Sequence, residues 1–262
     1  MTTVTGVRVR PDHRDYSHTR TFGAVDFFTP DFDVDAGLTV YNQNSEGRPY
    51  GCTGYTQADV CTDKDKVIYL PGFTYDKTRL MEGNEGKDVG CDIRKSLKST
   101  NVYGLQAQGE SEEQAFSHRR GSYYQIERAP DYFDGIRSAL ARGRSVSMAT
   151  AWYPVFNYPQ SNGVLNRPPD YSKKSTYHNY KACGWKTIDG KVYLKIKSWS
   201  GQQWGVNGFA YMSPEIVNKL LDDTYSGAFT LDEYTPNAKL VTIYNTYEVV
   251  LSYLYRMLQW LT

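Results

Sequence analysis

The chain has 262 residues, of which 40% are hydrophobic and 23% are charged, and these proportions are typical of a folded globular protein rather than a disordered one. Thirty basic and twenty-nine acidic side chains give a formal net charge of +1, which argues against a nucleic-acid binder that works through bulk charge. The 23 tyrosines fit either a substrate cleft or partner interface, or a core in which their hydroxyl groups find partners.

The chain carries no obvious targeting or membrane segment. No apolar stretch follows the first basic residues, so no secretory signal peptide is expected, and no run of about 18 apolar residues predicts a membrane-spanning helix. Four cysteines are too few for a disulfide scaffold in a chain of this length. We therefore expect free thiols in a reducing compartment, which predicts a cytoplasmic protein.

Helices are predicted mainly in the first half of the chain, at 52–60, 88–100 and 132–142. Gly54 weakens the first of them. Apolar residues at four-residue spacing support the other two, with Val89, Ile93 and Leu97 on the predicted apolar face of the second. Gly143 is the expected C-cap of the third helix.

Strands are predicted mainly in the second half, at 145–151, 180–186 and 192–197, with an earlier one at 38–43. Asp189-Gly190 is the expected hairpin turn between the last two strands. Helices followed by strands indicate an α+β fold with two lobes. The predicted divisions are an N-terminal arm (1–35), a helical lobe (36–125), a β-rich lobe (126–221) and a C-terminal extension (222–262).

Cys52 and His178 are the candidate reactive pair. Cys52 stands where a loop is predicted to become a helix, and the free N–H groups of a helix N-terminus favour a thiolate. A nucleophilic cysteine also needs a base, and His178 precedes a predicted strand of the other lobe. Either residue alone is more often structural, so the pair depends on its surroundings.

Those surroundings resemble the papain-like cysteine peptidases, in particular their bacterial and viral branch. The similarity covers roughly residues 8–220. Four segments carry it in the family's order: Pro11-Asp-His-Arg-Asp15-Tyr16, Asn42-Gln43 with Gly51-Cys52, His178-Asn-Tyr-Lys-Ala182-Cys-Gly184-Trp185, and a stretch from Tyr193 to Phe209 that aligns without gaps to the region around the family's Asn.

The resemblance implies a two-lobed papain-like fold, with the nucleophile Cys52 on a helical lobe and the base His178 on a β-barrel-like lobe. It implies hydrolysis of a polypeptide substrate through a thioester, with the oxyanion held by the Cys52 N–H and the Gln43 side-chain amide. No metal or other cofactor is implied. Further residues expected at the substrate cleft are Gly51, Trp199 and Trp204.

The sequence departs from the family where the histidine is oriented. The gapless alignment puts Ser198 at the position of the usual Asn, and a hydroxyl can accept the imidazole N–H although its side chain is shorter. Trp199-Ser200 inverts the family's Ser-Trp order, so the indole is displaced by one position. A shifted alignment would put Lys197 beside His178, where its charge would oppose an imidazolium, so Ser198 is preferred.

Three functions remain open at this point. The first is an active thiol endopeptidase. The second is a weakly active or inactive binding or structural subunit of a larger assembly, for example a virion. The third is another acyl-transfer reaction such as amide exchange. An apolar helix is predicted at 248–261, too short to span a bilayer. It is expected to bury its surface against its own lobe, a second copy or a protein partner, which also allows a virion-associated location.

Overall fold

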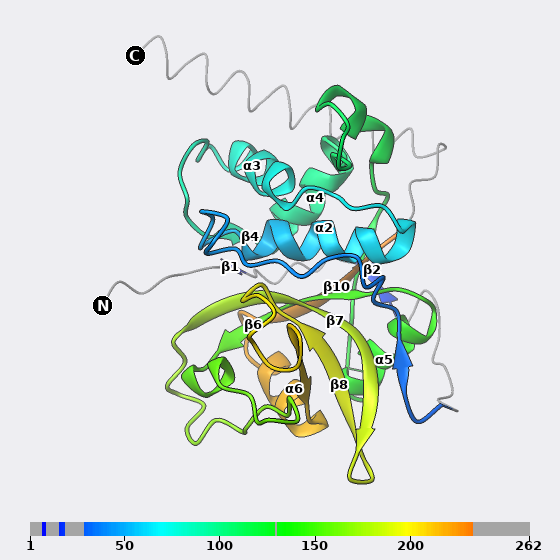
Figure 1. The fold of residues 1–262 in the computed structure, drawn as a ribbon, viewed down its shortest axis with the longest axis vertical. Coiled ribbons are helices and arrows are strands. Elements are labelled where there is room, and N and C mark those ends of the chain that lie inside the picture. Colours follow the sequence, from blue (N-terminus) through cyan, green and yellow to red (C-terminus); the bar gives the residue numbers. More distant parts are fainter. Residues whose placement is uncertain (1–6, 9–15, 19–28, 129, 233–262) are drawn as a thin grey trace.

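The computed structural model describes residues 7–8, 16–18, 29–128 and 130–232. Figure 1 shows a group of helices on one side and a twisted sheet on the other, with helix α2 (Cys52–Asp65) at their junction. This is the α+β, two-lobed arrangement that the sequence predicts. The apolar segment at 248–261 and its expected contacts lie outside the described residues.

The helical lobe is centred on α2, which packs against α3 (Pro71–Met81) and α4 (Ile93–Val102). Helix α2 begins at Cys52 as predicted and continues past Val60, whereas α3 is not among the predicted helices. Gly54 has a packing role, because a Cβ at this position would lie only 2.6 Å from the Cβ of Tyr75 on α3. The glycine that weakens the helix prediction is therefore what lets the two helices approach.

Helix α4 starts five residues later than predicted. The Asp92 side chain accepts hydrogen bonds from the backbone N–H groups of Arg94 and Lys95, and these bonds fix the first turn. Val89, expected on the apolar face, precedes the helix and is 44% exposed. The residues just before the helix form the short strand β4 (Cys91–Asp92), which pairs in parallel with β1 (Val7–Arg8).

The second lobe is built on one eight-stranded sheet in the order β2-β5-β10-β6-β7-β8-β9, with β3 paired to β7. The bounds of these strands are β2 (Tyr16–Ser17), β3 (Phe32–Asp33), β5 (Tyr123–Gln125), β6 (Val146–Trp152), β7 (Thr176–Ile188), β8 (Lys191–Lys197), β9 (Phe209–Met212) and β10 (Gly227–Leu231). The three strands predicted in the second half are confirmed. So is the hairpin turn, since Asp189 and Gly190 have φ values of 49° and 73°.

The sheet crosses the predicted domain boundaries. Strand β10 lies between β5 and β6, so residues 227–231 belong to the β-rich lobe rather than to an extension. The prediction of a strand at 38–43 is wrong. Only Asn42 forms a bridge, to Ser200, because the segment runs between the lobes and pairs with the loop after β8 instead of with a neighbouring strand.

The outer face of the sheet is covered by α5 (Tyr132–Ala141) and α6 (Pro214–Leu221), and the main core lies between them and strands β6 to β9. Gly143 has a φ of 73° and follows α5 as predicted. Two short 3₁₀ helices span Glu113–His118 and Pro154–Asn157. Within the described ranges, no helix has the length and apolar character needed to cross a bilayer.

Several tyrosines are core residues whose hydroxyl groups are paired. Tyr55 donates to Glu46 at 2.8 Å, Tyr69 to Asp65 at 2.5 Å and Tyr75 to Asp88 at 2.7 Å. These three rings are almost fully buried. For them, the core interpretation of the high tyrosine content is confirmed.

Candidate active site

Cys52 is the first residue of α2, and its side chain faces the sheet. It is 1% exposed and belongs to a buried cluster that includes Ala149 of β6 and Trp199. Backbone N–H groups of Asn179 on β7 and of Thr53 hydrogen-bond to the sulfur. The thiol of α2 therefore lies against the residue that directly follows His178.

His178 is held on β7 by strand pairing with Thr150 of β6 and by a side-chain hydrogen bond. Its Nε2 lies 3.0 Å from the Oγ of Ser198, which directly follows β8. Because Nε2 is engaged by Ser198, Nδ1 is the ring nitrogen left for exchange with a thiol. Lys197 points away, with its Nζ 3.1 Å from Asp35, so the contact pattern agrees with the gapless alignment.

The aromatic residue next to the imidazole is Trp152 at the end of β6. The two ring centroids are 4.8 Å apart, in an edge-to-face arrangement, and Tyr180 stacks on the imidazole at 6.2 Å. Trp204 packs on Trp152 at 6.1 Å and donates its indole N–H to a backbone carbonyl. Sequence reasoning missed Trp152, because β6 lies more than twenty residues upstream of His178.

Trp199 does not lie at the substrate cleft as expected. It is 1% exposed, and its Nε1 donates to the carbonyl of Asn179 at 2.9 Å and to the Thr56 hydroxyl at 3.0 Å. The exchange of Trp and Ser in the sequence thus turns the indole toward α2, where it joins the helix to β7. Trp152 takes the place beside the histidine.

The loop before Cys52 brings Gln43 and Gly51 to the same end of α2. The Gln43 amide donates to the carbonyl of Pro49 at 2.8 Å, and the Gln43 backbone N–H donates to the carbonyl of Trp199 at 3.1 Å. An NH₂ group has a second hydrogen available. A side chain at Gly51 would crowd the Arg48 carbonyl and the Tyr55 ring, each 3.1 Å from its Cβ.

Burial keeps both members of the pair neutral. It raises the pKa of the Cys52 thiol to about 12, although the backbone N–H groups of Asn179 and Thr53 act in the opposite direction. Burial also lowers the pKa of His178 to about 4. At neutral pH the resting pair is therefore a thiol and an uncharged imidazole.

The N-terminal strand β1 contributes to this burial. Val7 is 2% exposed and belongs to the same apolar cluster as Cys52. It is anchored by the pairing of β1 with β4, where Val7 is opposite Cys91. A chain segment from the predicted N-terminal arm is thus part of the packing around the thiol.

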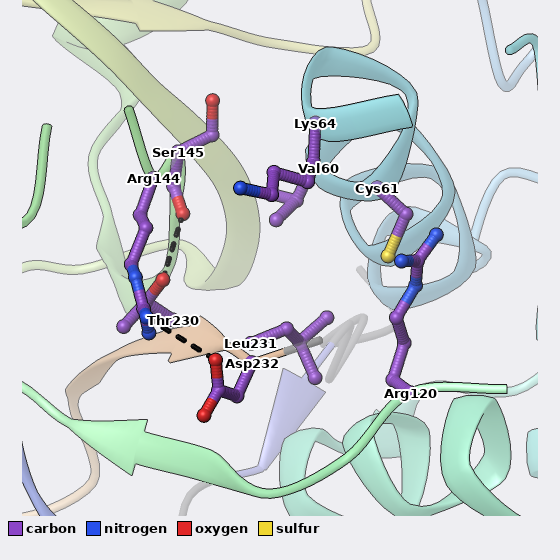
Figure 2. A pocket seen from close by; sticks show the side chains of 9 residues that line it. All are labelled: Val60, Cys61, Lys64, Arg120, Arg144, Ser145, Thr230, Leu231 and Asp232. Carbon is purple, nitrogen blue, oxygen red and sulfur yellow. Dashed lines mark hydrogen bonds and ion pairs between the residues drawn. The ribbon is translucent and has the colours of Figure 1, made fainter. Parts of the chain in front are cut away.

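The other three cysteines, Cys61, Cys91 and Cys183, are free and buried, as expected for ordinary core thiols. Cys61 borders a small pocket between the middle of α2 and strand β10 (Figure 2), and burial raises its pKa to about 11. The free volume is about 30 Å³, enough for one or two water molecules. Two of the arginines that line it are paired, Arg144 with Asp232 and Arg120 with Asp65.

Comparison with known proteins agrees with this geometry. Residues 89–224, just over half of the chain, match the sequence profile described as papain family cysteine protease. An uncharacterized peptidase C1-like protein of Acanthamoeba polyphaga mimivirus is 25% identical over 177 residues, which cover 58% of this chain and 56% of that protein. The alignment therefore spans little more than half the length of this viral relative.

Solved structures share the fold. Xylellain, a cysteine protease from Xylella fastidiosa, superposes with a TM-score of 0.73 at 18% identity, covering 90% of this chain and 98% of that one. Procathepsin B S9 from Trypanosoma congolense gives a TM-score of 0.62 at 11% identity, covering 88% and 87%. The chain belongs to the papain family of cysteine proteases and has the two-lobed α+β fold of that family.

Proposed function

We propose that this protein hydrolyses peptide bonds with Cys52 as the nucleophile and His178 as the general base. The observation that carries the proposal is the packing of the Cys52 sulfur against Asn179, next to a histidine whose Nε2 is engaged by Ser198. A thiol at a helix N-terminus, a base and a group that orients the base are the parts that nucleophilic acyl transfer requires.

In the proposed reaction, the thiol proton moves to Nδ1 of His178 as the sulfur attacks the carbonyl carbon of a peptide bond. The Ser198 oxygen accepts the Nε2 hydrogen and favours the imidazolium. The oxyanion receives hydrogen bonds from the Cys52 backbone N–H and from the second hydrogen of the Gln43 amide. His178 then protonates the leaving amine, and water hydrolyses the thioester.

Because the resting pair is neutral, proton transfer is part of the attack rather than a step completed beforehand. His178 has the role of a base at all pH values above its low pKa. Ser198 is one atom shorter than the usual Asn, yet its 3.0 Å contact is within hydrogen-bond range. The proposal therefore does not need an Asn at this position.

Labelling with a peptide that carries a thiol-reactive vinyl sulfone tests the proposal. We expect one label per chain on Cys52, loss of labelling in Cys52→Ala, and normal labelling in Cys61→Ala, which removes an equally buried thiol. Turnover is followed with a mixture of internally quenched peptides. Because Val7 packs in the thiol's cluster, both assays include a Val7→Asp variant, in which the added charge opposes docking of β1.

The alternative functions predict different results. Labelling without hydrolysis, but with exchange of an added amine into the peptide, would favour another acyl-transfer reaction. Absence of labelling in both wild type and Val7→Asp would contradict the peptidase proposal. It would favour a binding subunit on the same fold, an interpretation supported by the neutral, 1% exposed thiol.

A further inference from the structure

Five charged side chains are buried together between α2 and the sheet, in a cluster that the proposed chemistry does not use. The Nζ of Lys181 lies 2.5 Å from Asp35, 2.6 Å from Asp59 and 2.7 Å from Asp63. Lys197 is 3.1 Å from both Asp35 and Asp59. All five side chains are at most 4% exposed, so these contacts are screened little by solvent.

The three carboxylates alone have the spacing of a cation site. The ammonium of Lys181 lies within hydrogen-bond distance of all three, so the cation of this cluster is a side chain. Asp63 also accepts hydrogen bonds from the Ser145 hydroxyl and from the N–H of Ala36. The cluster is a structural connection rather than an ion-binding site.

The cluster touches the segments that carry Cys52, His178 and Ser198. Asp59 and Asp63 are on α2, which begins at Cys52. Lys181 is on β7, three residues after His178, and Lys197 directly precedes Ser198. A shift of any of these segments would stretch a buried ion pair.

The spacing along the two elements is matched. Asp59 is seven residues from Cys52, or about 10 Å along a helix. Lys181 is three residues from His178, again about 10 Å along a strand. The bond between Asp59 and Lys181 therefore ties α2 to β7 about 10 Å along the helix from Cys52 and about 10 Å along the strand from His178, and Asp63, one turn further along α2, contacts the same ammonium.

The charges resist separation of the elements. Burial would lower the pKa of Lys181, but Asp59 and Asp63 raise it well above its usual value. Burial would likewise raise the pKa of Asp35, yet Lys181 and Lys197 hold it at about 2. Both groups are thus charged at neutral pH, and separating a buried charge from its partner is strongly unfavourable.

We propose that Lys181 is a positioning residue which, through Asp59 and Asp63, fixes the register of α2 on β7 and so holds Cys52 opposite His178. The inference rests on the proposed cysteine chemistry, because it assigns the cluster to alignment of that pair. Misplacement of reacting groups by about 1 Å costs on the order of a hundredfold in rate.

The test replaces the connection without leaving an unpaired charge. The triple variant Asp59→Asn, Asp63→Asn and Lys181→Met keeps the pair of Lys197 with Asp35. The matched control is Asp65→Asn with Arg120→Met, which removes a partly buried ion pair between the last residue of α2 and the segment before β5. Peptide hydrolysis and the pH profile of vinyl sulfone labelling are measured for both, together with thermal unfolding.

We expect kcat of the triple variant to fall at least tenfold with KM within about twofold, and its labelling rate to rise with pH as for an ordinary thiol. The control should lose stability but keep the kcat and the pH profile of the wild type. If the triple variant does not fold, the same measurements are made on the double variant Asp63→Asn with Lys181→Met. This variant retains the ion pair between Asp59 and Lys197.

Two outcomes overturn the inference in distinguishable ways. A folded variant with wild-type kcat and pH profile shows that the cluster does not align the pair, while the proposed function stands. A wild-type protein, a control and a Val7→Asp variant that are all inert toward probe and peptide contradict the proposed function itself, and the positioning role with it.

Discussion

Replacing Val7 with aspartate should uncover the Cys52 thiol. Val7 is 2% exposed in the cluster that buries this thiol, and β1 is described over only two residues, both paired with β4. Removing the buried valine costs about 1.5–3 kcal/mol, and burying an unpaired carboxylate would cost several kcal/mol more. We expect the buried carboxylate to displace β1 from the site and so to expose the thiol.

The size of the effect follows from the thiol itself. Burial raises the pKa of Cys52 from an ordinary value of 9.0 to about 12, so full exposure would increase the thiolate fraction at pH 7 by up to about a thousandfold. Part of the burial comes from α2 and β6. We therefore expect a gain in alkylation rate between about tenfold and that upper limit.

The assay is the rate of iodoacetamide modification at pH 7, followed by mass spectrometry of the peptide that contains Cys52. The buried thiols of Cys61 and Cys183 are internal references for global unfolding. Val67→Asp is the matched control, because it places the same substitution at a valine that is 37% exposed. A Val7→Asp rate within twofold of this control would show that Val7 does not protect the thiol.

Three further predictions concern the residues around the pair. Ser198→Ala removes one hydrogen bond to His178, worth about 1 kcal/mol, so kcat/KM should fall roughly five- to tenfold. An unchanged kcat/KM would show that Ser198 does not orient His178. Trp152→Leu admits water to the imidazole, so the pKa of His178 should rise from about 4 toward 6.5 in an NMR titration. An unchanged pKa would mean that groups other than Trp152 exclude water from His178. Asp35→Asn should lower the free energy of unfolding at pH 7 by about 2–3 kcal/mol. The reason is that the depressed pKa of Asp35 stabilises the fold above about pH 4, and this contribution is lost as the pH falls toward 2.

The parts of the fold that depend on local sequence were predictable. The start of α2 at Cys52, the strands after residue 145 and the turn at Asp189 follow from breakers, periodicity and turn chemistry. The segment at 38–43 has a strand-like composition but runs between two lobes, and composition does not reveal which surface a segment will pair with. Helix α3 was missed although Pro71 stands at its first position, where proline is favoured.

The site could be predicted as far as its motifs extend. Ser198 beside His178 follows from an alignment without gaps, whereas Trp152 reaches the same ring from a strand far upstream. Part of the charge cluster could have been predicted from the sequence, because Asp59 and Asp63 are four residues apart and so share one face of α2. A lysine in the buried part of a strand, such as Lys181, requires partners of this kind.

One physical cause sets the state of the reactive pair. Burial raises the pKa of Cys52 to about 12 and lowers that of His178 to about 4, so moving the proton from sulfur to imidazole is unfavourable in this structure. At the ordinary values of 9.0 and 6.5 the same transfer costs about 3 kcal/mol. Burial is the largest cause of both shifts, so a change that lets water reach the pair would reverse both together. The ion pairs of Lys181 with Asp59 and Asp63 join α2 to β7 away from the pair, so the proposed positioning role does not depend on whether water reaches the pair.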